Sequence, residues 1–285
     1  MFDVHTLLPN LRCPSCKGNI TRAEEAGHCL QCGRQYPISS EHISFVVPGV
    51  GAGESSEPTD ALMYKLKLLV KKSPRLFTLL NHTLGTYVGT SAKQGIASLP
   101  KGSFIINIGA GAEVVRDDVI NVDIHPYREV QVIADIHCLP FKDNTVDAVI
   151  AESVLEHLSH PTQAVAEIYR VLKPGGLVYI SVPFIIGYHS SPGDYYRWTT
   201  SGMRELLKDF RKEELGIAVG PTNALTYILR EWLATLLSFN SSMLYQCWIL
   251  FFMTLFAPLN LMDHVLKHYQ SASTIAHLYY FIGRK

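Results

Sequence analysis

Short apolar runs alternate with helix-like stretches from residue 104 onward, and this alternation predicts parallel βαβ units. Buried strands are expected at residues 104–108, 119–122, 131–134, 146–151 and 177–182. Ahead of the last of these, Val165, Ile168 and Leu172 recur on one helical face. The Lys-Pro-Gly-Gly run at residues 173–176 is expected to end that helix, because Pro and Gly do not prolong one. The pattern therefore predicts an α/β fold with a mostly parallel sheet.

The chain ahead of this pattern divides in two. Residues 48–60 are rich in Gly, Ser and Pro, which predicts a linker between a module at residues 1–47 and a domain at residues 61–285. Apolar residues recur at helical spacing over residues 62–70 and 77–88, so two helices are expected at the start of the second domain.

A long apolar stretch precedes the end of the chain. From Trp232 to Met262, 31 residues contain no Asp, Glu, Lys, Arg or His. We expect an apolar helical insertion at residues 220–275, ahead of a closing strand at 276–285 that pairs with residues 214–219. Three interpretations stay open: a buried helix pair forming a lid or dimer face, a segment resting in a membrane interface, and a spanning helix, which needs about 20 apolar residues. Spanning is the least favoured, because it would separate the closing strand from the sheet.

The N-terminal module carries four of the six cysteines as two Cys-x-x-Cys pairs. Two such pairs let four thiolates converge on one Zn²⁺ in a closed, structural shell. The alternatives are two disulfides or four idle thiols. No basic segment followed by an apolar one marks a secretory signal, so we expect a reducing cytoplasm, which favours zinc. Short strands at residues 34–38 and 43–46 are expected to complete this zinc ribbon. The expected ligands are Cys13, Cys16, Cys29 and Cys32.

Candidate ligand-binding residues follow the first three strands. Gly109-Ala110-Gly111 comes directly after the first strand, where glycines let the backbone approach a ligand closely. Asp123 ends the second strand, and a carboxylate there accepts both hydroxyls of a ribose in dinucleotide-binding folds. Asp135 follows the third strand, where it is placed to accept from an adenine amino group.

This series resembles the class I S-adenosylmethionine (SAM)-dependent methyltransferases of the type-11 group over about residues 100–200. The Gly-Ala-Gly turn, the Asn-Val-Asp strand end, and the Ala-Asp…Leu-Pro-Phe, Glu-His-Leu and Arg-Val-Leu-Lys-Pro-Gly-Gly segments occur in the group's order and spacing. The resemblance implies a Rossmann-like sheet of seven strands with flanking helices, the last strand antiparallel. The cofactor-binding residues that it implies are Asn107, Gly109, Ala110, Gly111, Asp123, Ile124, Asp135, Ile136 and Glu152.

The chain departs from the group at two places. Asn107 stands where the group has an acidic residue, so it can orient a bound amino group by hydrogen bonding but cannot pair with it as a charge. Ala112 replaces the third glycine, and only seven residues separate Gly111 from Val119. The helix after the first strand is therefore expected to be short or absent. A nicotinamide enzyme is disfavoured, because the chain lacks a Gly-x-Gly-x-x-Gly run opening a helix.

Methyl transfer from a sulfonium requires the protein to align a nucleophile and exclude water, and an oxygen acceptor also needs a general base. Residues 189–199 resemble the His…Pro…Asp-Tyr-Tyr-Arg-Phe-Thr segment that caps the acceptor side in one branch of the group. The alternative for this segment is an Asp–Arg pair with aromatic packing in an ordered loop. The alternative for His157 is local hydrogen bonding on its helix. The candidate catalytic residues are His157, His189, Asp194 and Tyr195.

Composition narrows the function. Lys+Arg and Asp+Glu number 25 each, so there is no overall attraction to nucleic acid. The 47% of hydrophobic residues is high for a soluble protein. We expect a methyltransferase acting at oxygen on a small-molecule, glycan or lipid-linked acceptor; the alternatives are an rRNA or tRNA methyltransferase and a non-enzymatic scaffold. The expected location is the cytoplasm, with peripheral contact to the inner face of the membrane, or a dimer, through residues 232–262.

Overall fold

The computed structural model describes residues 6–23, 26–39, 41–46, 87–189 and 193–285. The linker expected at residues 48–60, the helix expected at 62–70 and nearly all of the helix expected at 77–88 lie outside the described residues.

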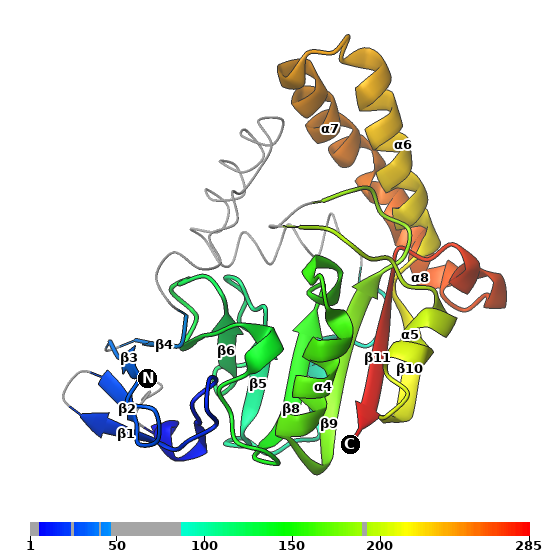
Figure 1. Ribbon diagram of the computed structural model, residues 1–285. Coiled ribbons are helices and arrows are strands. Elements are labelled where there is room, and N and C mark those ends of the chain that lie inside the picture. The colour runs from blue at the N-terminus through cyan, green and yellow to red at the C-terminus, as the bar shows by residue number, and fades with distance from the viewer. Residues whose placement is uncertain (1–5, 24–25, 40, 47–86, 190–192) are drawn as a thin grey trace.

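An eight-stranded sheet forms the centre of the described part of the chain (Figure 1). Its order is β10-β11-β9-β8-β5-β6-β7-β4. All neighbouring pairs from β9 to β4 run parallel, while β11 lies antiparallel between β9 and β10. The predicted Rossmann-like sheet with an antiparallel last strand is confirmed, with one strand more than expected. The bounds are β4 (Ile43–Ser44), β5 (Ile105–Ile108), β6 (Ile120–Asp123), β7 (Val132–Ile133), β8 (Val146–Glu152), β9 (Leu172–Pro183), β10 (Arg211–Val219) and β11 (Leu278–Arg284).

The additional strand, β4, comes from the segment that was expected only to complete the zinc ribbon. Ile43 forms a bridge with Ile38 of the ribbon and also pairs in parallel with Val132 of β7. The ribbon itself is a three-stranded antiparallel sheet of β1 (Ile20–Ala23), β2 (Ala26–Cys29) and β3 (Gln35–Pro37). β4 therefore joins the ribbon to the edge of the central sheet and covers the exposed edge of β7.

Residues before β1 fasten the ribbon to the central domain. Leu11 is fully buried and bridges to Phe141, and the Arg12 backbone N–H donates to the Pro140 carbonyl at 2.9 Å. The Arg12 guanidinium also pairs with Asp143 at 2.6 Å. One hydrophobic cluster runs without a break from the ribbon into the core of the sheet. The ribbon is thus packed against the domain, and the domain boundary at residue 47 stays a prediction.

One flanking helix of the sheet lies where the sequence pattern predicts it. In α4 (Pro161–Val171), Val165 and Ile168 are buried against the sheet. The helix ends at Val171 and β9 begins at the next residue, so Leu172 belongs to the strand. Residues 109–119, all described, contain no helix, as the short spacing after the first strand predicts. Three shorter helices lie beside the sheet: α3 (Ala92–Gly95), η5 (Leu155–His157) and α5 (Thr200–Leu206).

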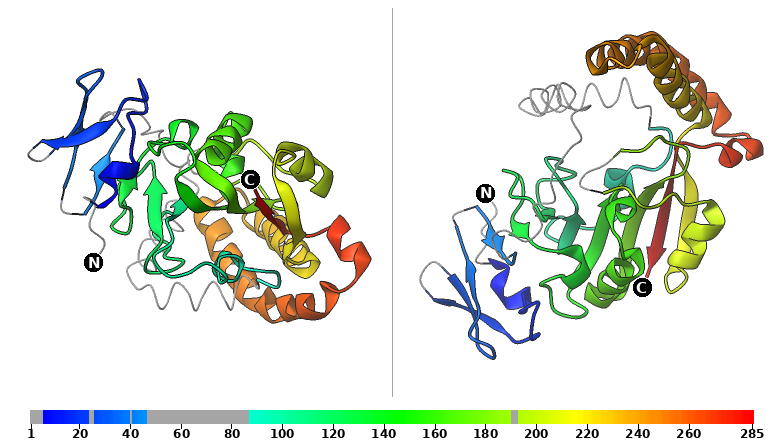
Figure 2. Two further views of the ribbon diagram at one scale, coloured as in Figure 1. Left: turned by 90° about the horizontal axis from the view of Figure 1, so that it is seen from below. Right: turned by 45° about the horizontal axis from the view of Figure 1, so that its top comes forward.

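The apolar insertion between β10 and β11 is helical, as expected. It consists of α6 (Pro221–Leu237), α7 (Ser242–Phe256), η6 (Ala257–Met262), α8 (Asp263–Leu266) and η7 (Gln270–Thr274). Helices α6 and α7 form a hairpin that projects from the molecule at the side away from the ribbon (Figures 1 and 2). The buried Asp263 carboxylate fixes its base by accepting the first N–H groups of α6, from Thr222 at 2.7 Å and Asn223 at 3.0 Å.

The hairpin is not buried against its own domain. One helical stretch, Ser242–Leu266, has the length and hydropathy, 1.6, that a bilayer crossing requires, and only 22% of its most apolar window is buried. Large apolar side chains are exposed along both helices: Leu225, Ile228, Trp232, Leu236, Phe239, Met243, Leu244, Phe251 and Leu255. We call these residues the hairpin surface.

Candidate active site

The parallel strands β5, β6, β7, β8 and β9 end at one edge of the sheet, because parallel neighbours share a direction. The strand ends and loops at this edge carry the residues expected to bind the cofactor or to act in catalysis, except Asn107, which lies within β5.

The turn after β5 has two glycines in the left-handed region, with φ of +64° at Gly109 and +56° at Gly111. A Cβ added to Gly109 would lie 2.5 Å from a Val154 methyl carbon, so glycine is required there by packing. A Cβ added to Gly111 would meet nothing within 4 Å. Gly111 thus presents bare backbone to open space, while Ala110 between them is buried.

Asp123 at the end of β6 holds this turn in place. One carboxylate oxygen accepts the Gly111 N–H at 2.8 Å, and the other accepts the His125 N–H at 2.9 Å, across Ile124. A carboxylate has about four acceptor positions, so capacity for the hydroxyls of a ribose remains. Asp123 is only 8% exposed.

Asp135 caps η4 (Ile136–Cys138) after β7, the neighbour of β6. Its carboxylate accepts the His137 N–H at 2.9 Å and lies 2.8 Å from His137 Nδ1. The side chain is 53% exposed and Ile136 packs against the core. Asp123 and Asp135 therefore stand on adjacent strand ends; their roles toward a nucleoside stay predictions.

Asn107 has a role inside the sheet that sequence reasoning missed. It is buried, and its amide nitrogen donates to Asn121 Oδ1 of the adjacent strand at 3.2 Å. No acidic residue thus follows directly from β5 to meet a cationic ligand.

Acidic groups come instead from the next strand over and from the turn. Burial, together with the charge of Glu113, raises the pKa of Glu152 at the end of β8 to about 7. The Tyr87 hydroxyl lies 3.5 Å from this carboxylate. Sequence reasoning placed Glu152 beside the cofactor but missed Glu113, two residues beyond the glycine turn, and Tyr87, for which no local pattern gave a signal.

A second cluster lies at the same edge, after β8 and β9. Glu156 in η5 is 0% exposed, and neither carboxylate oxygen has a hydrogen-bond partner among the described residues. Burial raises its pKa to about 8. The Nε2 atoms of His157 and His189 lie 4.0 Å and 3.9 Å from Glu156 Oε1. Sequence reasoning quoted Glu156 only as part of the Glu-His-Leu segment and missed it as a site residue.

The other ring nitrogens of the two histidines are held by oxygen atoms. His157 Nδ1 lies 2.5 Å from the Gly193 carbonyl oxygen. His189 Nδ1 lies 3.3 Å from the Gly187 carbonyl oxygen and 3.5 Å from Asp194 Oδ2. Burial lowers the pKa of His189, so its neutral form dominates near pH 7.

The remaining two candidates take supporting positions. The Asp194 carboxylate accepts the backbone N–H of His189 at 2.8 Å. It also forms a bidentate ion pair with the Arg197 guanidinium, at 2.5 and 2.6 Å. Tyr195 donates its backbone N–H to the Glu156 carbonyl at 2.8 Å, but its side chain is 60% exposed. The structure therefore brings His157, His189 and Asp194 together around Glu156. Their catalytic roles stay predictions, and the Asp–Arg pair expected as the alternative is also present.

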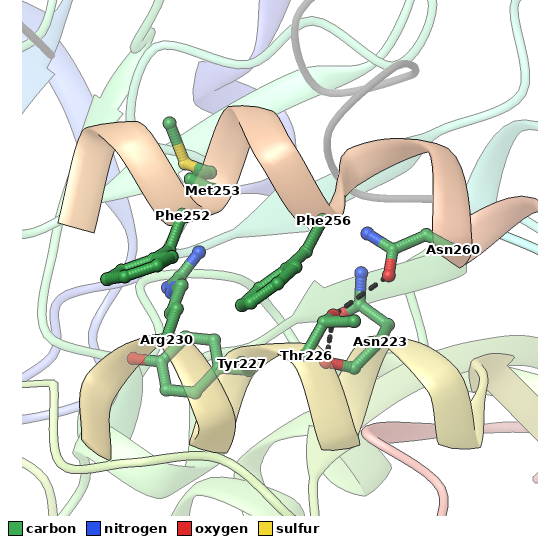
Figure 3. Close-up of a pocket in the computed structure, with 8 residues that line it drawn as sticks. All are labelled: Asn223, Thr226, Tyr227, Arg230, Phe252, Met253, Phe256 and Asn260. Carbon is green, nitrogen blue, oxygen red and sulfur yellow. Dashed lines mark hydrogen bonds between the residues drawn. The ribbon is translucent and has the colours of Figure 1, made fainter. Parts of the chain in front are cut away.

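A cavity of about 230 Å³ lies between α6 and α7 near the base of the hairpin (Figure 3). Helix α7 contributes apolar side chains to it, and α6 contributes mainly polar ones. The Arg230 guanidinium stacks 4.1 Å from the Tyr227 ring centre. Tyr227 also lies close to Gly187, at the start of the loop that carries His189, so this cavity adjoins that loop. It is lined by Asn223, Thr226, Tyr227, Arg230, Phe252, Met253, Phe256 and Asn260.

The four ribbon cysteines lie together as free thiols. The Cys13 and Cys32 sulfurs are 3.7 Å apart and those of Cys16 and Cys29 are 3.3 Å apart, with all four within 4.8 Å of one another. Zn–S bonds of about 2.3 Å in a tetrahedron place sulfurs roughly 3.8 Å apart, so the set fits zinc, whereas a disulfide needs about 2.05 Å.

Comparison with known proteins agrees with this arrangement. Residues 108–180 match the methyltransferase domain family. An uncharacterised 37.1 kDa transposon protein of Streptomyces fradiae is 38% identical over 99 residues, which cover 35% of this chain and 27% of that protein. A demethylmenaquinone methyltransferase of Protochlamydia amoebophila is 41% identical over 51 residues, covering 18% of this chain and 21% of that enzyme. The chain thus spans only about a quarter of the length of these curated relatives.

Among solved structures, phosphoethanolamine N-methyltransferase 2 of Haemonchus contortus in complex with SAM is 16% identical, with a TM-score of 0.45. That match covers 76% of this chain and 58% of that one. The strand order is that of a Rossmann-like α/β methyltransferase fold. The match over residues 108–180 supports a methyltransferase domain in this part of the chain.

Proposed function

We propose that the chain transfers the methyl group of SAM to an oxygen atom of a lipid-linked acceptor at the inner surface of a membrane. The observation that carries the methyl-transfer part is the open backbone at Gly111 beside the Asp123 carboxylate, within the segment that matches the methyltransferase domain family.

In this proposal the cofactor lies along the edge formed by β5, β6 and β7. Asp123 would accept the ribose hydroxyls, and Asp135 with Ile136 would hold adenine. SAM carries positive charge on its sulfonium and amino groups, and Glu152 and Glu113 supply the negative charge that Asn107 cannot. Burial makes the charged form of Glu152 unfavourable while the site is empty. A bound cation next to the carboxylate would offset this cost and favour the ionised form.

The acceptor oxygen would enter beside Glu156, His157 and His189. SAM bound at this edge would supply an activated methyl group, which a lone pair of this oxygen would accept while the C–S electron pair returns to sulfur. The oxygen loses its proton at this cluster. Asp194 positions His189, and Arg197 keeps Asp194 ionised.

The hairpin surface supports a lipid-linked acceptor and a peripheral contact with the inner face of a membrane. Most of its exposed apolar residues fall in the segment from Trp232 to Met262, which has no Asp, Glu, Lys, Arg or His, and a helix of this kind lies favourably in the bilayer interface. The cavity of Figure 3 has an apolar wall from α7 and a polar wall from α6 that carries one cation, Arg230, which suits a chain that ends in a polar or anionic group.

We also propose that Cys13, Cys16, Cys29 and Cys32 bind one structural Zn²⁺ and that the protein is cytoplasmic. A closed shell of four thiolates leaves no position for a substrate, so this ion would stabilise the ribbon and take no part in the reaction.

The acceptor class is tested with SAM labelled in its methyl group, incubated with the protein and with lysate separated into lipid, glycan, RNA and protein fractions. We expect label in the lipid fraction, in a linkage resistant to the nucleases and proteases that clear the other fractions. Label in RNA or in free glycan would contradict the acceptor class. No label in any fraction, despite SAM binding, would contradict methyl transfer and favour a scaffold.

The membrane contact is tested by flotation with anionic phospholipid vesicles. Phe239, 84% exposed at the hairpin turn with φ of +47°, is changed to Asp, which tolerates that backbone region better than Phe. The matched control is Leu30→Asp, an exposed apolar residue of the ribbon at 69%. We expect flotation of wild type and control and loss in the variant. A dimer that forms in solution and leaves vesicles unbound would overturn the membrane contact.

A further inference from the structure

The buried Glu156 is the least satisfied polar group at the sheet edge. Both of its oxygens are buried without a hydrogen-bond partner among the described residues. Buried polar atoms nearly always have partners, and an unpartnered buried carboxylate is costly. The nearby cation that could pair with it, Arg197, already makes two short hydrogen bonds to Asp194. The described side chains therefore supply no hydrogen-bond partner for this carboxylate.

The two histidines around Glu156 are arranged as ligands. His157 Nδ1 lies 2.5 Å from the Gly193 carbonyl oxygen, which favours a proton on Nδ1 and a free lone pair on Nε2. His189 Nδ1 lies 3.3 Å from the Gly187 carbonyl oxygen and 3.4 Å from the Arg197 guanidinium, so its Nε2 is the ring nitrogen that faces Glu156. Both Nε2 atoms lie close to the same carboxylate oxygen, and the rings stand edge to face with centres 5.1 Å apart. Histidines that bind metals characteristically donate their second ring N–H to a carbonyl or carboxylate in this way.

The distances suit an ion between the three side chains. One ligand atom from each of Glu156, His157 and His189 lies within 4.8 Å of the others. Bonds of about 2.0–2.2 Å to nitrogen and oxygen put two ligands at most roughly 4.2 Å apart, so small side-chain rotations close the site. Asp194 and Arg197 adjoin it as a neutralised pair, which leaves the Glu156 carboxylate as the local negative charge.

We propose that Glu156, His157 and His189 bind a divalent first-row transition metal ion, separate from the zinc of the ribbon. Two imidazoles and one carboxylate suit Zn²⁺, Mn²⁺, Fe²⁺ or Co²⁺, and three protein ligands leave coordination positions open. If the proposed methyl transfer is correct, the acceptor oxygen takes an open position, where the ion lowers its pKa and its proton passes to solvent. The two histidines then act as ligands rather than as bases.

The test counts metal in the full chain. Protein with its ribbon loaded with zinc is dialysed against Co²⁺, and bound metals are measured by elemental analysis for wild type, Glu156→Gln and His189→Gln. The matched control is His160→Gln, an exposed histidine beside the same segment. We expect each site variant to bind one equivalent of metal fewer than wild type and the control. The lost cobalt should lack the intense near-ultraviolet bands of thiolate ligation.

Equal metal content in wild type and in both site variants, with all proteins folded by circular dichroism, would overturn the proposal. The measured quantity is the difference in bound metal between wild type and variants, so the metal content of the ribbon does not affect it. It is also independent of methyl transfer, since SAM binding and label transfer are measured separately and can succeed where this site fails.

Discussion

The left-handed glycines allow a sharp test of where the cofactor lies. Gly111, Gly109 and Gly175 have φ of +56°, +64° and +78°, so an alanine at any of them carries a similar backbone strain of about 1–2 kcal/mol. The surroundings differ. A Cβ has open space at Gly111 and at Gly175, whereas at Gly109 it lies 2.5 Å from Val154.

These environments give three distinct expected outcomes. Gly111→Ala and Gly175→Ala each lower the free energy of unfolding by about 1–2 kcal/mol. Gly109→Ala adds overpacking of roughly 1–3 kcal/mol, so it is clearly the least stable. Gly175 lies at the amino end of β9, far from the ligand edge, so its variant binds SAM like wild type. The methyl group at Gly111 stands where the cofactor would approach, and we expect the dissociation constant to rise about 5- to 150-fold, which corresponds to roughly 1–3 kcal/mol.

Urea unfolding gives the stabilities, and calorimetric titration with SAM gives the affinities. The comparison is decisive because Gly111→Ala and Gly175→Ala are matched in strain and in free space. If Gly111→Ala binds SAM as tightly as Gly175→Ala does, no cofactor passes over this turn and the reasoning fails.

Two further predictions concern charge and metal. Because burial raises the pKa of Glu152 to about 7, its carboxylate is ionised above that pH and protonated below it, so SAM affinity should fall as pH decreases through 7. Glu152→Gln should bind weakly at every pH, and an unchanged pH dependence in that variant would exclude this role. Removing the ribbon metal by Cys16→Ser should lower the melting temperature by about 4–8 °C if about 2 kcal/mol is lost, while the exposed Cys247→Ser should leave it unchanged. Loss of the ribbon metal should also weaken SAM binding, because the Cys138 thiol in η4, beside Asp135, donates to the Pro14 carbonyl of the ribbon. Equal melting temperatures in the two variants would argue against zinc.

The central strands were predictable because each is a short, mostly apolar run that becomes buried on both faces. Residues Ile105, Ile106 and Ile108 of β5 are all at most 1% exposed, as a strand covered on both sides requires. The missing helix after β5 was also predictable, since the residues between Gly111 and Val119 are too few for a helix with its connections.

Long-range pairings were not predictable from local pattern. Ile43 reads as a ribbon strand, and only the position of Val132 in three dimensions makes it an edge strand of the main sheet. The start of β9 at Leu172 was also missed, because an apolar residue after a helix fits either element. The apolar insertion was located correctly, but composition alone does not say whether such helices pack inward, and most of α7 does not.

Part of the candidate site was predictable from the order of the strands. Asp123 and Glu152 end parallel strands and Asp135 closely follows one, so the topology places all three at the same edge of the sheet. Glu156 was overlooked because its distinguishing property is complete burial without a hydrogen-bond partner among the described residues, which depends on the loop after β9 contacting η5.

The most direct test of the methyltransferase assignment is calorimetric titration of SAM into wild type and Asp123→Asn. The substitution keeps the side chain's shape but removes its charge and one acceptor. Hydrogen bonds to charged groups contribute about 1.5–3 kcal/mol, so we predict one binding site in the wild type and affinity roughly 10- to 150-fold weaker in the variant. Equal affinity in the two proteins, both folded, would contradict the account.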